Sequence, residues 1–247
     1  MVLDVYGASD KGQVRDLNED SFCLHGFEDG QPLGFCVLSD GMGGHNAGEV
    51  ASQRTVQFVA EELLKDPELH EPPKMLSRAV ELANRRICEM AILNQGQRGM
   101  GATLVAATVC PEAVYIANVG DSRAYVMRDK ELVQITKDHS VVEEMVANGT
   151  ITPEEARNHP QRNIITRAIG ADPHTEADIF EYEYFAGDVL ILCSDGLSSM
   201  LTDTEIQEIL GKGTTAKNMV TELIDSANRR GGRDNITVIG IRFIQEG

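Results

Sequence analysis

The stretch GFCVLSDGMGGH, residues 34–45, decides how the fold of this chain is interpreted. Its apolar first half has the composition of a buried strand, and it delivers Asp40 into a glycine-rich turn. Gly41 has no side chain, so its backbone carbonyl could approach a bound ion, and the two glycines that follow Met42 permit backbone angles that other residues resist. A lone Asp-Gly pair would be an ordinary turn. Six consecutive residues of the form DGMGGH instead indicate a functional loop at a strand end.

Other acidic motifs lie far from this one in the sequence, at Asn18-Glu19-Asp20, Ser194-Asp195-Gly196 and Arg233-Asp234-Asn235. Each puts a carboxylate at the start or the end of an apolar, strand-like run. A fold that joins these strand ends could gather the carboxylates into one oxygen-lined pocket, and such a pocket binds hard divalent cations. The motifs together therefore predict a metal-dependent hydrolase.

Each of these acidic residues also has a purely structural interpretation. Asp195 could be a helix N-cap, Asp234 could belong to a salt-bridged turn beside Arg233, and Asp121 could be only a hairpin residue. No local structural need, however, explains positions as distant as 20 and 234 together. A shared site is the simpler hypothesis.

Composition limits the classes of protein to consider. The chain has 247 residues with no break in composition, so we expect a single domain spanning residues 1–247. Its formal net charge of −17 repels nucleic acid and anionic membrane surfaces, so we expect neither as a partner. The same charge repels phosphorylated substrates, so a phosphate-handling site would need local positive charge, and bound cations are the obvious source.

The start of the chain, the length of its apolar runs and its cysteines indicate the compartment in which the protein acts. No basic segment followed by an apolar stretch begins the chain, and no apolar run is long enough to span a bilayer, so we expect a cytoplasmic protein. The five cysteines are widely spaced and embedded in apolar runs. We expect them to be small core residues and not disulfides or zinc ligands.

Hydrophobic periodicity predicts strands and helices in alternating groups. Strands are expected at residues 2–8, 20–24, 34–39, 102–109, 113–119, 122–128, 132–135, 179–185, 189–193 and 236–244. Helices are expected at about 47–65, 72–90, 141–147, after Pro153, at 204–210 and at 216–229. Short connections imply antiparallel pairing, and helix pairs between runs of strands suggest a sandwich of sheets with helices outside. The more polar residues from about 140 to 171 are the best candidate for a surface insertion or lid.

The chain resembles a known family in seven motifs that follow in that family's order. The motifs are GQVRDLNED (12–20), DGMGGH (40–45), GAT (101–103), VGDSR (119–123), TKDHS (136–140), SDGL (194–197) and RDNIT (233–237). The family is the metal-dependent protein phosphatases of type 2C, in particular the short bacterial serine/threonine phosphatases. The resemblance implies an α+β fold, a four-layer α-β-β-α sandwich of two antiparallel sheets flanked by helices. It also implies a binuclear Mn²⁺ or Mg²⁺ centre at one end of the sheets, with a flap at about residues 141–171 beside it.

The resemblance also implies metal ligands. Asp40 would bridge two ions, Asp195 and Asp234 would complete the coordination of one, and the carbonyl of Gly41 would serve the other. Asp121 together with Asp195 matches a third, weaker metal position. A water that bridges two cations about 3.5 to 4 Å apart loses its proton near neutral pH and can attack phosphorus in line.

Four further residues are expected to take part in the reaction. Glu19 and Asp20 match positions that hold metal-bound waters. Arg15 is expected to clamp the phosphate, because a planar guanidinium donates two parallel hydrogen bonds to phosphate oxygens; the alternative is a surface arginine paired with Asp16 or Glu19. His45 is the candidate proton donor to the leaving alkoxide, and its alternative role is to cap the helix that follows.

The sequence therefore predicts a cytoplasmic, monomeric phosphatase that acts on phosphoserine and phosphothreonine of proteins and opposes a cognate serine/threonine kinase. Two other functions remain open. The same ions could hydrolyse small phosphomonoesters, or the chain could be an inactive module that binds phosphoproteins. The complete set of metal ligands argues against the inactive module, because binding alone does not need them.

Overall fold

Strand β3 (Gly34–Met42) carries the stretch quoted first and shows why its apolar run is continuous. The side chains of Phe35 and Val37 pack against helices, whereas those of Cys36 and Leu38 pack against a second sheet. Successive side chains of a strand point to opposite faces of the sheet, so a strand buried on both faces needs apolar residues at every position. The computed structural model describes residues 1–27, 33–44, 47–66 and 68–245.

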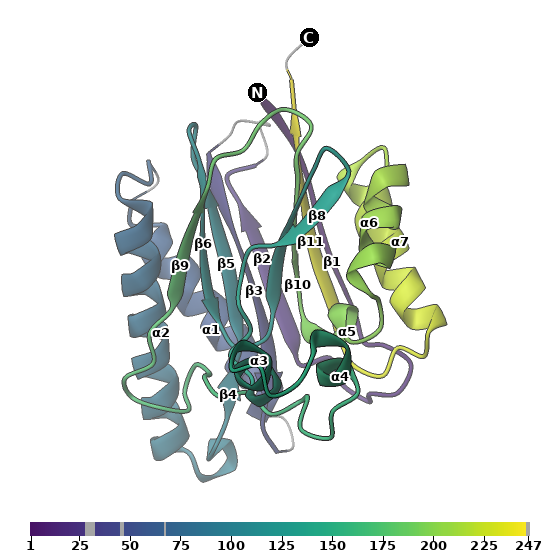
Figure 1. Cartoon of the computed structure of the whole chain (residues 1–247). Helices are drawn as coiled ribbons and strands as arrows, with labels where there is room; N and C mark the ends of the chain where they lie inside the picture. The colour runs from purple at the N-terminus through teal and green to yellow at the C-terminus, as the bar shows by residue number, and fades with distance from the viewer. Residues whose placement is uncertain (28–32, 45–46, 67, 246–247) are drawn as a thin grey trace.

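Two antiparallel sheets lie face to face between helices (Figure 1). The first sheet has the order β1-β11-β10-β7-β8, with bounds Val2–Asp10, Ile236–Ile244, Val189–Cys193, Arg123–Arg128 and Glu131–Gln134. The second has the order β2-β3-β5-β6-β9, and the strands other than β3 have bounds Asp20–His25, Leu104–Val109, Val114–Val119 and Asp178–Tyr182. A short strand, β4 (Gly101–Ala102), pairs with the end of β3.

Helices cover the outer face of each sheet. On the second sheet these are α1 (Ala47–Leu63) and α2 (Pro72–Leu93), which a short 3₁₀ turn, η1 (Gln95–Gln97), follows. On the first sheet they are α6 (Asp203–Lys212) and α7 (Ala216–Arg229). One buried apolar cluster lies between the sheets and one lies beneath each helix pair. The predicted α-β-β-α sandwich is therefore confirmed.

Three of the predicted strands differ most from the observed ones, and each of these differences has a local cause. β3 continues beyond Ser39 because Gly41 and Met42 pair with β4. The strand expected at 102–109 is interrupted at Thr103, which lies between β4 and β5. The strand expected at 179–185 ends at Tyr182, because Tyr184 turns inward and donates hydrogen bonds of 2.9 and 2.8 Å to the carbonyls of residues 110 and 111.

The flap region, between β8 and β9, holds α3 (Val141–Ala147) and α4 (Pro153–Arg157). Its base is closed by the bridge between Ser140 and Ile165 and by a hydrogen bond of 2.8 Å from Thr166 N to the His139 carbonyl. Thr152 forms a capping box with Glu155, which explains why α4 begins at Pro153. Figure 1 shows both helices at the same end of the sandwich as α5 (Asp195–Ser198), a short helix that the sequence did not predict.

The cysteines and the helices bear on the predicted compartment. All five cysteines are free; Cys36, Cys110 and Cys193 are buried, and Cys23 and Cys88 are partly buried. Burial raises the pKa of the Cys193 thiol to about 12, so this thiol is a core group without nucleophilic character at neutral pH. Within the described residues, no helix combines the length and the apolar character needed to cross a membrane.

A buried carboxylate joins the two sheets at the end of β10 opposite Asp195. Asp188, of which 3% of the side chain is exposed, accepts a hydrogen bond of 2.6 Å from Arg128 Nη2 at the end of β7. It also accepts bonds from the hydroxyl of Tyr182 in β9, at 3.2 Å, and from the backbone N–H of Phe185, at 2.9 Å. One carboxylate therefore connects strands of both sheets.

We expect Asp188→Ala to lower the free energy of unfolding by about 2–4 kcal/mol, because it leaves the Arg128 guanidinium and a backbone N–H without their partner. Urea unfolding followed by circular dichroism measures this change. Glu222→Ala is the matched control, since its exposed pair with Arg229 should contribute less than about 1 kcal/mol. Equal losses in the two variants would show that the network does not stabilise the sandwich.

Candidate metal centre

Five aspartates from five separate segments come together at one end of the two sheets. Asp20 begins β2 and lies directly opposite Asp40 in the register of β2 and β3. Asp121 lies in the turn between β6 and β7, Asp195 follows β10 as the first residue of α5, and Asp234 precedes β11. The four others all contribute to the electrostatic field at Asp40. The structure thus brings together the carboxylates that the sequence grouped.

Burial and mutual repulsion weaken the acidity of these carboxyl groups. Burial first, and then the negative charges of its four neighbours, raise the pKa of Asp40 well above its usual range. Burial likewise raises the pKa of Asp121 to about 8, that of Asp20 to about 7 and that of Asp195 to about 6. Bound cations would supply the positive charge that such a cluster of buried carboxyl groups needs in order to ionise.

The donor atoms fit hard divalent cations. Within the described residues, Glu19 Oε1, Asp20 Oδ1 and Asp195 Oδ1 are buried and have no hydrogen-bond partner. A buried carboxylate oxygen without a partner is costly, so each is a ready ligand for an ion or for its water. No three acidic, histidine or cysteine side chains of the described part already close around one ion position. The charges of the four other aspartates nevertheless all act on Asp40, which indicates one pocket. Carboxylate oxygens that do not close around a single point suit Mg²⁺, because this ion keeps several waters.

The backbone of Asp40 is fixed by Thr103. The Asp40 N–H donates to Thr103 Oγ1 at 3.0 Å, and the Thr103 N–H donates to the Asp40 carbonyl at 2.8 Å. Thr103 Oγ1 also lies 2.7 Å from Ser122 Oγ, next to Asp121. Thr103 therefore links two of the five segments that carry carboxylates. It exchanges two hydrogen bonds with the backbone of Asp40, and it contacts the residue next to Asp121.

The side chain of Asp20 is held by hydroxyl groups of the opposite sheet. Its Oδ2 accepts hydrogen bonds from Ser194 Oγ at 2.8 Å and from Thr237 Oγ1 at 2.6 Å. Thr237 Oγ1 lies in turn 2.7 Å from Ser9 Oγ, to which Asn18 Nδ2 donates at 2.8 Å. These bonds orient the carboxylate and leave its Oδ1 without a partner.

Asp195 does not cap α5, as one interpretation of the sequence allowed. Ser194 occupies the N-cap position, and Asp195 is the first helical residue. The Ser194 side chain makes no capping bond, because its hydroxyl donates to Asp20 instead. The next position, 196, requires a glycine, because a Cβ there would lie 1.9 Å from the Asn235 carbonyl oxygen. This close approach sets the loop that carries Asp195 against the loop that carries Asp234.

Gly41 also lies at a close backbone contact. A Cβ at this position would lie 2.0 Å from the carbonyl oxygen of Gly48 in α1, so no side chain fits. Its N–H donates to the Glu19 carbonyl at 3.0 Å. Burial raises the pKa of the Glu19 carboxyl group, although the nearby Arg15 lowers it. Gly41 and Glu19 therefore border the pocket side by side.

Arg15 reaches the centre from the loop between β1 and β2. Its Nη2 donates to Asp234 Oδ2 at 2.8 Å, and its Nη1 lies 3.9 Å from Glu19 Oε2. The salt bridge of Asp234 is thus with Arg15 and not with the neighbouring Arg233. Asn235 holds this loop in place: its Oδ1 accepts from the Glu19 N–H, and its Nδ2 donates to the carbonyls of residues 11 and 17.

Two histidines were considered in the sequence. His45, the expected proton donor, lies outside the described residues. His139 is buried, and its Nδ1 accepts a hydrogen bond of 3.0 Å from the Gly120 N–H, while its Nε2 lies 3.3 Å from Asp178 Oδ2. Burial lowers the pKa of this histidine, so the neutral ring supports the turn that carries Asp121.

Comparison with known proteins agrees with this arrangement. The family described as Protein phosphatase 2C matches residues 10–237. The chain belongs to this family. It is 40% identical over 234 residues to the serine/threonine phosphatase stp of Listeria monocytogenes, which covers 94% of this chain and 92% of that relative.

Solved structures of this protein phosphatase 2C family superpose closely. The crystal structure of the Mycobacterium tuberculosis serine/threonine phosphatase PstP/Ppp is 39% identical, with a TM-score of 0.89 over 99% of this chain and 100% of that one. The catalytic domain of PstP in complex with two manganese ions is 37% identical, with a TM-score of 0.87 over 99% of each chain. A protein similar to this one has therefore been observed with two manganese ions.

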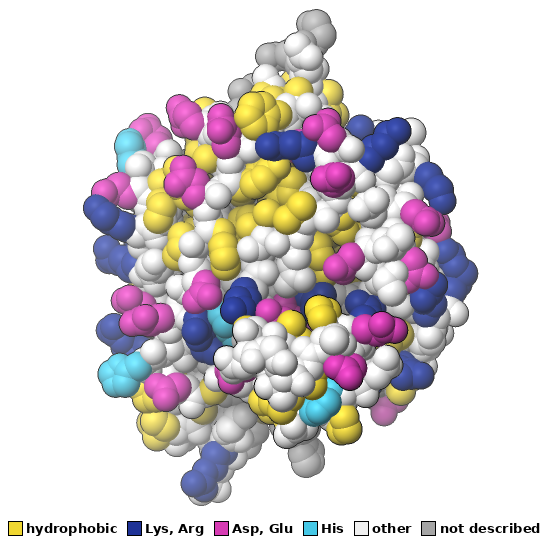
Figure 2. Space-filling model, viewed as in Figure 1, with side chains coloured by type: hydrophobic (Ala, Val, Ile, Leu, Met, Phe, Trp, Pro, Cys, Tyr) yellow, Lys and Arg dark blue, Asp and Glu magenta, His cyan; other side chains and the backbone are white. Residues whose placement is uncertain are grey.

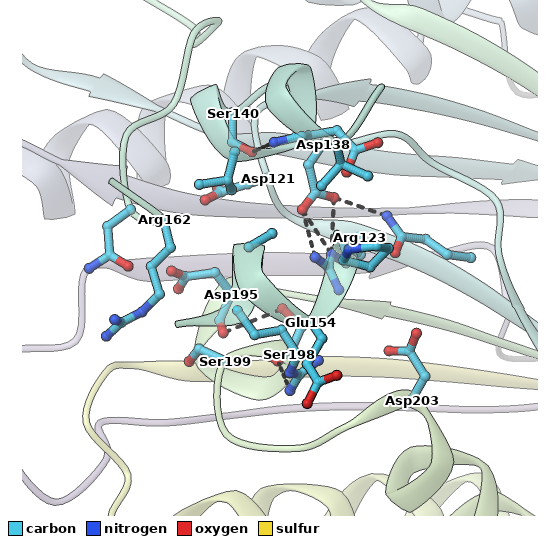
Figure 3. Close-up of a pocket in the computed structure, with 18 residues that line it drawn as sticks. Asp121, Arg123, Asp138, Ser140, Glu154, Arg162, Asp195, Ser198, Ser199 and Asp203 are labelled. Carbon is cyan, nitrogen blue, oxygen red and sulfur yellow. Dashed lines mark hydrogen bonds and ion pairs between the residues drawn. The ribbon is translucent and has the colours of Figure 1, made fainter. Parts of the chain in front are cut away.

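A cavity of about 490 Å³ opens beside the carboxylates of this protein phosphatase 2C chain (Figure 3). Asp121 and Asp195 line it where it meets the candidate metal centre, and Ser198 and Ser199 continue its wall along α5. Residues of α3 and α4, among them Glu154, line it from the flap side. The cavity thus separates the flap from the core.

The residues that fix the carboxylates were not predicted. They are hydroxyl and amide side chains that lie within or beside the quoted motifs: Thr103, Ser122, Ser194, Thr237 and Asn235. A hydroxyl or amide next to a conspicuous acidic residue was the available signal. The sequence could not supply the partner of each of these residues, which for Thr237 and Asp20 lies 217 positions away.

Removal of one repelling carboxylate should stabilise the protein when divalent cations are chelated. Because the pKa of Asp121 is raised in the folded state to about 8, this group favours folding below its ordinary value of 3.8 and loses that contribution as the pH rises towards 8. In EDTA, Asp121→Asn should therefore gain about 1–2 kcal/mol over the parent between pH 5 and pH 8, a modest figure because part of the side chain meets solvent.

Urea unfolding at several pH values measures this gain, and Asp225→Asn on the exposed side of α7 is the control. Added Mn²⁺ should stabilise the parent more than Asp121→Asn. A gain that does not vary with pH would contradict the assignment of repulsion to Asp121.

Proposed function

We propose that this chain hydrolyses phosphoserine and phosphothreonine esters of proteins at its carboxylate centre, with Mn²⁺ or Mg²⁺ as cofactor. The observation that carries the proposal is the convergence of five aspartates, of which Asp20 and Asp195 each have a buried oxygen without a hydrogen-bond partner among the described residues. The names of the relatives, serine/threonine phosphatase stp and PstP, and the PstP structure with two manganese ions support it.

We assign ligand roles according to position around Asp40. Asp40, on which the charges of the four other aspartates act, would be shared by two ions. Asp195 and Asp234, whose loops touch through Gly196, would complete the coordination of one ion, and the Gly41 carbonyl would serve the other. Asp121 and Asp195, which both line the cavity, would hold a third and weaker position.

Two such ions, when bound, lower the pKa of a water between them and offset the charge of the phosphoryl group. The chain's own residues do the rest. Asp20 is held by the hydroxyls of Ser194 and Thr237, which leaves its Oδ1 free to accept a hydrogen bond from a water, and Glu19 Oε1 is free in the same way. Both oxygens would accept hydrogen bonds from the attacking water and so orient it.

Arg15 holds the phosphate in this proposal. About 47% of its side chain is exposed, and its one hydrogen bond to the described residues runs from Nη2 to Asp234. Its remaining N–H groups are available to phosphate oxygens, and its planar geometry favours two parallel bonds. His45 is the proposed donor of the proton that the leaving serine or threonine oxygen needs.

We also propose the setting in which the protein acts. It works as a single catalytic domain of residues 1–247, with residues 141–171 as its flap, and as a monomer whose apolar clusters are each closed within one chain. Its free cysteines favour the reducing cytoplasm. The acidic side chains spread over the face in Figure 2 disfavour nucleic acid and anionic membranes, and a serine/threonine kinase is the expected source of its substrates.

Metal removal and replacement tests the assigned ligands. EDTA-stripped protein should release no phosphate from a phosphothreonine peptide, and Mn²⁺ should restore activity. Asp234→Asn should lower the restored kcat at least about 100-fold, because it removes a ligand charge and releases Arg15. Asp225→Asn controls for the loss of a surface carboxylate. A normal Mn²⁺-dependent rate in Asp234→Asn would overturn the ligand assignment.

Substitution of Arg15 tests the phosphate clamp and the substrate class. Arg15→Ala should lower kcat/KM for the phosphopeptide about 10- to 100-fold, and Arg15→Lys should recover only part of this, because an ammonium lacks the planar pair of donors. Steady-state phosphate release measures both variants. If the parent protein is efficient only on sugar phosphates, a metabolite phosphatase replaces the proposed protein phosphatase.

A further inference from the structure

Few polar groups of the described residues attach the flap helices to the core, and one of these groups is an arginine. Neither α3 nor α4 contains a buried residue. The backbone bonds at the base of the flap, at Ser140–Ile165 and Thr166–His139, lie at its two ends and leave its outer part unrestrained.

Arg157, the last residue of α4, makes the connection for that outer part. Its Nη2 donates to the carbonyl oxygen of Leu201 at 3.0 Å and to that of Ser198 at 3.3 Å. Among the described residues, no other hydrogen bond or ion pair joins positions 142–162 to residues outside the flap and its base. One guanidinium therefore holds the far end of the flap on the core.

One acceptor, the Ser198 carbonyl, lies at the end of the element that carries a proposed metal ligand, and the other, the Leu201 carbonyl, lies in the turn that follows this element. Ser198 ends α5, and Asp195 begins it. The carbonyls at the end of a helix have no partner within the helix, so an arginine is a suitable donor to them. The bond thus ties the position of the flap to the helix that presents Asp195 to the centre.

The same bond joins two parts of the wall of the cavity beside the centre. Arg157 and Glu154 of α4 line the cavity, as do Ser198 at the end of α5 and Ser199 after it (Figure 3). A phosphopeptide bound in this cavity would contact both parts of the wall with the residues on either side of its phosphorylated residue. A small aryl phosphate has no such flanking residues.

We propose that Arg157 is a positioning residue that sets the specificity of this centre for phosphorylated peptides over small phosphomonoesters. The proposal rests on the proposed phosphatase function. When the flap is free, only a fraction of molecules holds the two parts of the wall together, and the apparent KM of a substrate that contacts both parts rises in inverse proportion to that fraction.

Steady-state kinetics on two substrates tests the proposal. Arg157→Ala should raise KM for a phosphothreonine peptide roughly three- to tenfold while kcat/KM for p-nitrophenyl phosphate changes by less than about twofold. Arg157→Lys should recover part of the peptide KM, because an ammonium can still donate to both carbonyls. Asn158→Ala, an exposed neighbour in the flap, is the matched control and should leave both substrates unchanged.

Hydrogen–deuterium exchange provides a readout that does not depend on activity. Arg157→Ala should speed exchange of the amides of α3 and α4 and leave those of β10 and β11 unchanged. Unchanged exchange in the flap, or an equal loss of kcat/KM on both substrates, would overturn the role of Arg157. If the parent protein proves inactive on both substrates, the proposed function fails, and the exchange experiment still decides whether Arg157 holds the flap.

Discussion

Repulsion between buried carboxylates is the constraint on which the rest of this structure depends. Asp20 and Asp40 face each other across neighbouring strands, where like charges destabilise a sheet. Three more aspartates add their charge to the same pocket. No fold would gather these groups for stability alone, because burial already raises their pKa values. The arrangement becomes favourable only with cations, so the fold is organised to hold negative charge in place for them.

The side chains that hold these carboxylates in place are themselves uncharged. Thr103 fixes the backbone of Asp40, and hydroxyls of Ser194 and Thr237 fix the carboxylate of Asp20. Hydroxyl groups orient an oxygen without neutralising it, whereas a lysine or arginine at the same place would compete with a metal ion for the carboxylate. Arg15 is the exception, and it lies at the exposed rim of the centre, where a substrate phosphate would arrive.

The sequence predicted the layers of the fold and the carboxylates but not the contacts that fix them. Strands buried on both faces, such as β3 and β10, appear as continuous apolar runs, and the stripe of α7 has helical spacing, so local pattern was sufficient. The four-residue helix α5 is too short to show periodicity. Of the two partners of Arg15, Glu19 is close in sequence and was considered. Asp234 was missed because it is 219 positions away, and pairing over that distance follows only from the assembled sheets.

The bonds to Asp20 join the two halves of the sandwich, because Asp20 belongs to one sheet and Thr237 to the other. At the far end of β10, Asp188 joins the same two sheets through Arg128 and Tyr182. The apolar layer between the sheets is thus bounded by a polar tie at each end and acts as a spacer of fixed thickness. The volume of the side chains in that layer consequently determines how far apart the two sheets hold their carboxylates. The apolar core therefore helps to set the dimensions of the metal site.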